Sequence, residues 1–168
     1  MDALDGRLID LFAADPRVGV LEASRRLGVA RGTVQARLDK LTASGVITGW
    51  GPDLSPEALG YPVTAFLTIE IRQETSQGGH DVVGAHLAAI PEVLEVHTIT
   101  GAGDLWARVV ARSNADLQRV IDLVLEHPAI VRSATVIALA TQVPYRVRPL
   151  ARVAADLAPT EAGNTRTG

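Results

Sequence analysis

The stretch VLEASRRLGVARGTVQARLDKLTASG (residues 20–45) decides the fold of the first third of this chain. It predicts two short helices, over about residues 20–27 and 31–43, joined by a tight turn at Gly28. Glycine accepts the left-handed backbone conformation that commonly ends a helix, so Gly28 marks the end of the first one. The second helix carries a buried stripe at helical spacing, formed by Val34, Leu38 and Leu41. Two such helices around a glycine turn are typical of a helix-turn-helix.

The sequence on either side completes a small head. A preceding helix is expected from about residue 4 to residue 12, with Asp2 or Asp5 as its cap and Asp15-Pro16 beyond its end. Its apolar face consists of Leu4, Leu8, Leu11 and Phe12. After Gly45, the segment Val46–Trp50 has the composition of a strand. We therefore predict a winged helix-turn-helix.

The charge of this head favours a polyanion as its partner. Residues 24–50 hold five bases and one acid, a net charge of +4, whereas residues 53–148 hold seven bases and eleven acids, a net charge of −4. A recognition helix presents its N-terminal residues to base edges in the major groove. Arg31 and Gln35 suit guanine and adenine edges, each pair contributing about 1–3 kcal/mol of discrimination. The expected DNA-binding residues are Arg25, Arg26, Arg31, Thr33, Gln35, Arg37 and Lys40, with phosphates as the targets of Arg25, Arg26, Arg37 and Lys40.

The hydrophobic period changes from helical to alternating at Val63. The sequence from there predicts a strand from residue 63, a helix over 81–90, strands over 94–100 and 105–112, a helix over 115–126 capped by Asn114, and a strand over 132–141. The segments that follow Pro91 and Pro128 resemble each other, as expected of a duplicated βαβ unit. The order βαββαβ is that of a ferredoxin-like domain, and the fold class is α+β.

These elements divide the chain into four parts. We expect a DNA-binding domain at 1–52, a linker at 53–62, an effector-binding and oligomerisation domain at 63–148, and a disordered tail at 149–168. The boundary lies at the breaker-rich segment Gly51-Pro52-Asp53-Leu54-Ser55-Pro56, and the tail lacks a strong period.

The chain resembles the Lrp/AsnC (feast/famine) family of transcriptional regulators over about residues 4–145. The residues that carry the resemblance are Leu4-Asp5, Ile9, Leu11, Arg17, Arg26-Leu27-Gly28-Val29, Val34, Arg37-Leu38, Leu41, Gly45-Val46-Ile47, Gly49-Trp50 and Leu59-Gly60. A glycine-containing turn, Thr100-Gly101-Ala102-Gly103-Asp104, then lies between the two central strands expected of the second domain. Such a turn, taken alone, is also what an ordinary hairpin requires.

The resemblance implies a DNA-binding regulator whose DNA binding or assembly responds to a small molecule, expected to be an amino acid. The backbone N–H groups of the glycine-containing turn would bind the carboxylate of the effector, and Asp104 would bind its ammonium. The expected effector residues are Thr100, Gly101, Ala102, Gly103 and Asp104 of this turn, with Ser133 and Thr135 of the last strand. Two positions depart from the family pattern: Ala30 replaces the usual capping serine, and Gly103 replaces a common aromatic residue.

An uncovered sheet face predicts self-association. Helices on one face of the sheet leave Phe66, Ile99, Trp106 and Val110 for the other, which is too apolar for water. We expect a homodimer, and the resemblance implies further assembly to a tetramer or octamer.

Several classes of protein are disfavoured. The chain has no cysteine, no apolar run of membrane-spanning length and no basic N-terminal signal, so we expect a cytoplasmic protein without disulfides or membrane contact. Its four histidines are scattered, with a meeting of His86 and His97 across the sheet as the one pairing considered, and no metal, cofactor or enzyme motif is expected. Two alternatives remain: a ferredoxin-like enzyme, for which no acid–base pair can be assembled, and a small-molecule-binding module whose helical head docks a protein.

Overall fold

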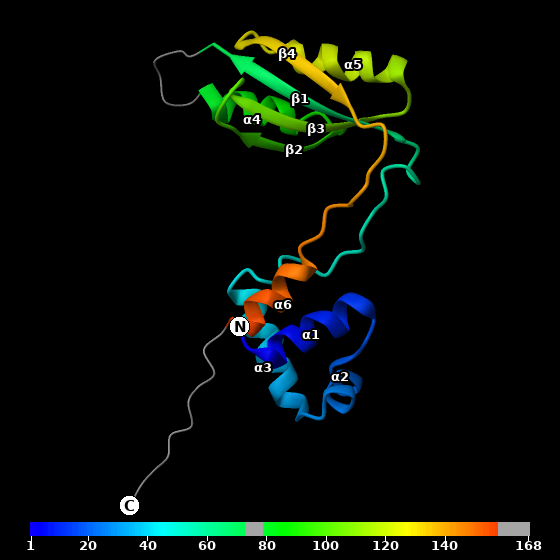
Figure 1. Cartoon of the computed structure of the whole chain (residues 1–168), viewed down its shortest axis with the longest axis vertical. Helices are drawn as coiled ribbons and strands as arrows, with labels where there is room; N and C mark the ends of the chain where they lie inside the picture. The colour runs from blue at the N-terminus through cyan, green and yellow to red at the C-terminus, as the bar shows by residue number, and fades with distance from the viewer. Residues whose placement is uncertain (73–78, 158–168) are drawn as a thin grey trace, which may run out of the picture. The chain divides into compact units, whose positions relative to one another are not determined.

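The protein is described by a computed structural model over residues 1–72 and 79–157. Its chain divides into two compact units, one made of Met1–Pro52 with the residues from Val143 onward, the other of Asp53–Gln142. Figure 1 shows a helical unit and a unit built on a sheet. None of the helices within the described residues is long and apolar enough to cross a membrane.

The helical unit begins with α1 (Ala3–Ala14), α2 (Val20–Leu27) and α3 (Arg31–Ala43). Asp2 caps α1: its carboxylate accepts hydrogen bonds from the backbone N–H groups of Leu4 and Asp5, and the Asp5 carboxylate accepts one from the N–H of Asp2. This reciprocal capping box satisfies N–H groups that a helix start leaves unpaired. The core between the three helices consists of Leu8, Val18, Ala23, Val34 and Leu38.

The turn between α2 and α3 has the expected geometry. Gly28 lies in the left-handed region with φ 68°, and its N–H donates to the carbonyl of Arg25 while that of Val29 donates to Ser24. Ala30 stands at the start of α3 without a side-chain capping bond, as its apolar side chain requires. The recognition helix therefore begins with N–H groups that no capping side chain occupies.

The predicted wing strand is wrong. Residues 46–50 form no strand, because the N–H groups of Val46 and Ile47 donate instead to the Leu41 carbonyl at the end of α3. Ile47 packs on the core of the head, and the Trp50 ring stands edge-on against Phe12 with the centroids 5.5 Å apart. The segment is apolar because it covers the helices.

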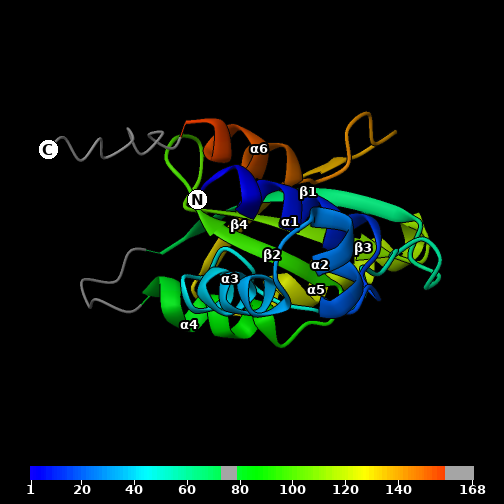
Figure 2. The same cartoon turned by 90° about the horizontal axis from the view of Figure 1, so that it is seen from below.

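The expected disorder from residue 149 is wrong for the described part of the tail. Residues Arg148–Asp156 form α6, which packs against α1 (Figures 1 and 2). The Asp10 carboxylate of α1 accepts hydrogen bonds from Arg148 Nε and Arg152 Nε, both at 2.9 Å. Ala155 is buried against Gly6, where a methyl group on the glycine would lie 3.0 Å from the Ala155 Cβ. The remaining predicted tail, residues 158–168, lies outside the described residues.

The second unit is the predicted βαββαβ arrangement. Strands β1 (Val63–Ile71), β2 (Val93–Thr98), β3 (Leu105–Ala111) and β4 (Ile130–Ile137) form an antiparallel sheet in the order β2-β3-β1-β4. Helices α4 (Gly79–Ala88) and α5 (Asn114–Leu125) lie on one side of it (Figures 1 and 2). The core between sheet and helices includes Ala65, Leu67, Ile69, Val83, Leu87, Ala107, Val109, Leu117, Val120 and Val124.

Local details differ from the sequence predictions. Ser113, one residue before the expected Asn114, caps α5 by accepting a hydrogen bond from the Asp116 N–H. The His86 ring lies beside His127, with centroids 5.2 Å apart, whereas His97 lies against Trp106 on β3. The suggested meeting of His86 and His97 is therefore wrong, because α4 lies on the helix side of the sheet and His97 pairs in register with Trp106 on the other.

Candidate nucleic-acid interface and effector site

The outward side of α3 carries four of the predicted DNA-binding residues. Arg31, Thr33, Gln35 and Lys40 are all exposed, while Val34 and Leu38 hold the helix on the head core. Arg31 forms no ion pair within the described residues. Gln35 Nε2 donates to Asp39 Oδ1 at 2.8 Å, a contact one helical turn along the same face. The side chains at the start of α3 are thus accessible to a partner.

The two predicted phosphate ligands on α2 are exposed but already near acids. Arg26 Nε donates to Glu22 Oε1 at 3.0 Å, and Arg26 Nη1 lies 3.4 Å from Asp15 Oδ2. Arg25 Nη1 lies 3.8 Å from the other Glu22 oxygen. Exposed pairs of this kind are weak, so both guanidinium groups remain able to change partner.

Arg37, predicted as a phosphate ligand, forms ion pairs within the head. Its guanidinium binds the carboxylates of Asp2 and Asp5, and the Asp5 side chain is only 2% exposed. The hydrogen bond from Arg37 lowers the pKa of the Asp2 carboxyl. Since Arg37 neutralises the acids of the α1 capping box through Nη1, it joins α3 to α1, and its assignment as a phosphate ligand stays a prediction.

The glycine-containing turn forms one side of an open hollow of about 520 Å³ in the sheet unit. Its lining consists of Glu70, Ile71, Gly101, Ala102, Gly103, Asp104, Val131 and Arg132. Gly101 has a φ of 112°, which favours glycine, and a methyl group on Gly103 would lie 2.5 Å from Thr68 Cγ2. The turn therefore lies directly on β1, which only a residue without a side chain allows.

Asp104 fastens this turn to the end of β1. One carboxylate oxygen, Oδ2, accepts a hydrogen bond from the Ile71 N–H at 2.8 Å, and the Asp104 N–H donates to the Ile69 carbonyl at 3.0 Å. One carboxylate oxygen of Asp104 is thus already committed to the backbone. Its position beside the hollow agrees with the sequence prediction, but its contacts are those of a positioning residue.

Three predicted effector residues do not line this hollow. Thr100 lies before its lining residues in the turn, and Ser133 and Thr135 lie opposite Ile69 and Leu67 in the β1–β4 register. Directly opposed residues share a sheet face, so both hydroxyl residues are on the helix side of the sheet. The sequence reasoning missed Glu70 and Arg132, which do line the hollow. Their opposite charges were visible, but only the register brings them together.

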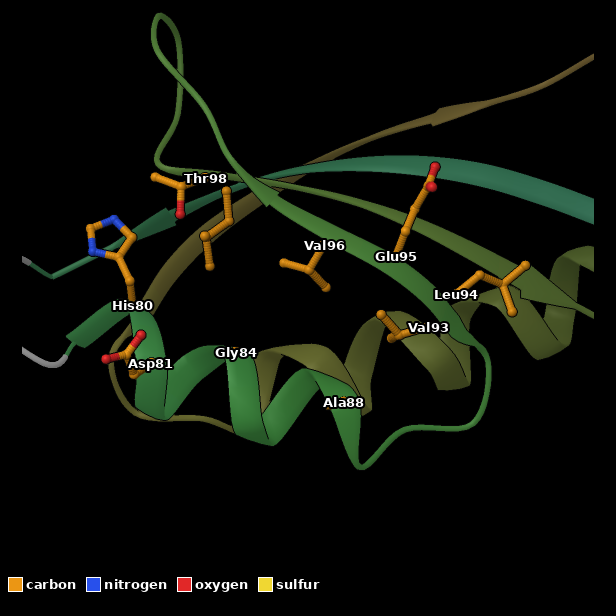
Figure 3. A pocket seen from close by; sticks show the side chains of 10 residues that line it. His80, Asp81, Gly84, Ala88, Val93, Leu94, Glu95, Val96 and Thr98 are labelled. Carbon is orange, nitrogen blue, oxygen red and sulfur yellow. The ribbon is translucent and has the colours of Figure 1, made fainter. Parts of the chain in front are cut away.

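A second hollow, of about 440 Å³, lies between α4 and β2 (Figure 3). Val93 and Val96 point from β2 toward α4, with His80 and Asp81 at the start of the helix. Glu95 points away from the helix. Within the described residues, no cluster of three or more histidine, aspartate or glutamate side chains is arranged to hold a metal ion. The described residues that line this hollow therefore do not suggest a metal site.

A helix-turn-helix with an accessible recognition helix, on the same chain as a ferredoxin-like domain with an open hollow, defines a DNA-binding regulator with a ligand-binding domain. Comparison with known families agrees. Residues 1–42 match the AsnC-type helix-turn-helix domain, and residues 64–147 match the Lrp/AsnC ligand binding domain. The chain belongs to the Lrp/AsnC family of transcriptional regulators, and it is accordingly a regulator and not an enzyme.

Individual relatives extend over most of the chain. The HTH-type transcriptional regulator FL11 of Pyrococcus horikoshii is 30% identical over 141 residues, which cover 84% of this chain and 91% of that protein. The structure of E. coli AsnC has a TM-score of 0.79 at 29% identity and covers 89% of this chain and 99% of that one. The feast or famine regulatory protein of M. tuberculosis complexed with L-methionine has a TM-score of 0.73 at 26% identity, covering 84% and 93%.

Proposed function

We propose that this regulator recognises specific double-stranded DNA sites through the start of α3 and acts in the cytoplasm, where that DNA lies. The observation that carries the proposal is the exposed side of α3 with Arg31, Thr33 and Gln35 at its accessible N-terminal half. These residues are assigned to base edges. Lys40, with Arg25 and Arg26 on α2, is assigned to phosphates, which position the protein without reading sequence.

DNA binding is testable by fluorescence anisotropy with the segment upstream of this protein's own gene, or with sites selected from a random pool. Excess nonspecific DNA and a salt series separate base reading from phosphate contact, because counterion release makes phosphate binding steeply salt-dependent. We expect competitor-resistant binding that the double change Arg31→Ala with Gln35→Ala weakens by about tenfold or more. Arg72→Ala, which removes an exposed charge from the other unit, is the matched control. A site pool that yields no bound sequence would contradict the proposal.

The alternative in which the head docks a protein makes a different prediction. An interface between proteins need not lose affinity steeply as salt rises, and it does not require the pairing of Arg31 and Gln35 with bases. If random-pool selection fails, the exposed surface of α3 becomes the first surface to test for protein binding.

We further propose that an amino acid bound at the hollow beside the Gly101–Asp104 turn modulates DNA binding or assembly. The family membership supports a ligand in this domain, and a relative at 26% identity is a complex with L-methionine. The turn presents backbone to the hollow, and Asp104 holds it in place. Repeating the DNA titration with each standard amino acid identifies the effector, and Asp104→Ala should abolish its influence while DNA binding persists.

Homodimer formation through the sheet face opposite the helices completes the proposal. Phe66 and Trp106 stack there with their centroids 5.1 Å apart, and Val136 on the same face is 66% exposed. Arg108, which lies opposite Phe66 in the register and two residues from Trp106 on β3, has a buried Nε without a hydrogen-bond partner in the described residues. A second sheet would cover the apolar groups, and larger assemblies would build on the dimer. Light scattering of wild type and Trp106→Lys tests this: the variant should become monomeric.

A further inference from the structure

Glu70 and Arg132 form an ion pair at the rim of the hollow, a pairing that the sequence did not predict. They lie directly opposite each other in the register of β1 with β4, and Arg132 Nη2 donates to Glu70 Oε1. Their side chains are 37% and 71% exposed. Both line the same hollow as the Gly101–Asp104 turn.

The backbone on the other side of the hollow has N–H groups that are available to a ligand. The N–H groups of Ile99 and Asp104, at the two ends of the turn, donate to carbonyls. Those of Gly101, Ala102 and Gly103 donate to no acceptor within the described residues. Gly103 keeps this backbone close to β1, because any side chain there would collide with Thr68.

A free α-amino acid carries the charges that this arrangement can receive. Its ammonium and carboxylate are attached to one carbon, so they can replace the two partners of a single ion pair without leaving a charge unpaired. An exposed ion pair contributes little stability, so opening it costs little. A ligand with only one of the two charges would leave either Glu70 or Arg132 without a partner.

We propose that the effector enters by replacing this ion pair: Glu70 binds its α-ammonium, and Arg132, with the N–H groups of the turn, binds its α-carboxylate. The inference rests on the proposed amino-acid effector and specifies how its head group is recognised. It transfers ammonium recognition from Asp104, whose Oδ2 already accepts a hydrogen bond from the Ile71 N–H, to Glu70. The site then selects zwitterions, and the effector side chain extends from the open hollow.

The competing interpretation is an ordinary cross-strand ion pair, which occurs in many sheets. The two differ in which ligand group each residue reads. If the pair is only structural, breaking it would change the affinity for all ligands alike. If the pair recognises the ligand, replacing Glu70 would remove the preference for a free ammonium, and replacing Arg132 would remove the preference for a free carboxylate.

The experiment uses the full chain. Thermal shift with each of the twenty standard L-amino acids selects the strongest as the probe. Calorimetry then compares that amino acid with its N-acetyl and its carboxamide forms. We expect the wild-type protein to bind each derivative at least about tenfold more weakly than the free amino acid, because each derivative loses one charge-assisted contact. Glu70→Gln should bind the free and N-acetyl forms equally weakly, and Arg132→Gln should bind the free acid and the amide equally weakly.

Two kinds of control accompany these variants. Glu126→Gln and Arg146→Gln remove exposed charges elsewhere and should keep the wild-type pattern. Glu70→Arg with Arg132→Glu keeps an ion pair but reverses its direction, so it should fold normally and lose affinity for the free amino acid.

The outcomes separate the two levels of the proposal. If no amino acid binds the wild-type protein, both the amino-acid effector and this inference are overturned. If an amino acid binds and both single variants keep the wild-type discrimination, the ion-pair inference is overturned while the amino-acid effector stands.

Discussion

Arg37 and Arg132 each bind carboxylates, but the two ion pairs differ in their surroundings. Arg37 joins α3 to the capping box of α1, where the Asp5 side chain is 2% exposed. Arg132 meets a single glutamate at the surface, and its own side chain is 71% exposed. Removing a buried partner strands a charge in a medium that solvates it poorly, whereas water readily replaces an exposed one. The Arg37 pair, here called the closed pair, therefore stabilises the fold, whereas the Arg132–Glu70 pair, the open pair, is available to a ligand.

The largest effect is expected from breaking the closed pair. Arg37→Met should leave Asp5 buried without its cation and lower the free energy of unfolding of the head by about 3 kcal/mol. Urea unfolding followed by circular dichroism measures this. Arg31→Met, on the exposed side of the same helix, is the control and should remain near wild type. An equal stability for the two variants would remove the distinction between closed and open arginines.

The next effect tests whether the wall of the open hollow is closely packed. Gly103→Ala places a methyl group 2.5 Å from Thr68 Cγ2 and should cost about 1–3 kcal/mol of unfolding free energy. Adding Thr68→Ala should recover much of the loss. At Gly84 on α4 no atom lies within 4 Å of the added methyl group, so Gly84→Ala should not destabilise the protein. A silent Gly103→Ala would show that the turn can move away from β1.

An intermediate case is Asp10, which binds two arginines of α6 while remaining 29% exposed. Hydrogen bonds from Arg148 and then Arg152 lower the pKa of the Asp10 carboxyl. A carboxyl with a lowered pKa stabilises the folded state above its unfolded pKa, about 3.8, and loses this contribution as pH falls through its folded value.

Asp10→Asn should therefore cost up to about 1 kcal/mol near pH 7, and the difference from wild type should shrink as pH falls below 3.8 and through the lowered pKa of the folded carboxyl. Urea unfolding across this pH range measures the difference, and hydrogen exchange of α6 shows whether the helix is released. Asp156→Asn, an exposed acid on α6, is the control. A difference that persists at low pH would contradict the assigned role of the carboxylate.

The smallest effect on stability is expected at the open pair. Arg132→Gln should shift the melting temperature of the unliganded protein by no more than about 2 °C, because an exposed pair adds little. The same variant should lose effector discrimination in the calorimetric test. A large loss of stability instead would place Arg132 with Arg37 among the residues that hold the fold.

Much of the secondary structure could be predicted because its signals are local. The range of α3, the left-handed Gly28 and a cap at Asp2 or Asp5 follow from residues within one or two turns of each other, and the structure identifies Asp2 as the cap. The order βαββαβ follows likewise from alternating and helical periods. The prediction of a wing strand was wrong because the apolar residues of this segment suit a strand as well as a covering segment. Only the hydrogen bonds to the Leu41 carbonyl distinguish the two.

The family, the position of the recognition helix and the turn at Gly101–Asp104 could be read from the sequence alone, since each depends on short runs of residues. Other features depend on contacts between distant residues. Arg37 meets Asp2 and Asp5 more than thirty residues away, and Arg148 meets Asp10 across 138. Only the β1–β4 register placed Glu70 beside Arg132 and put Ser133 on the face of the sheet that the helices cover. Residues distant in sequence become partners through packing and strand register, which no local period encodes.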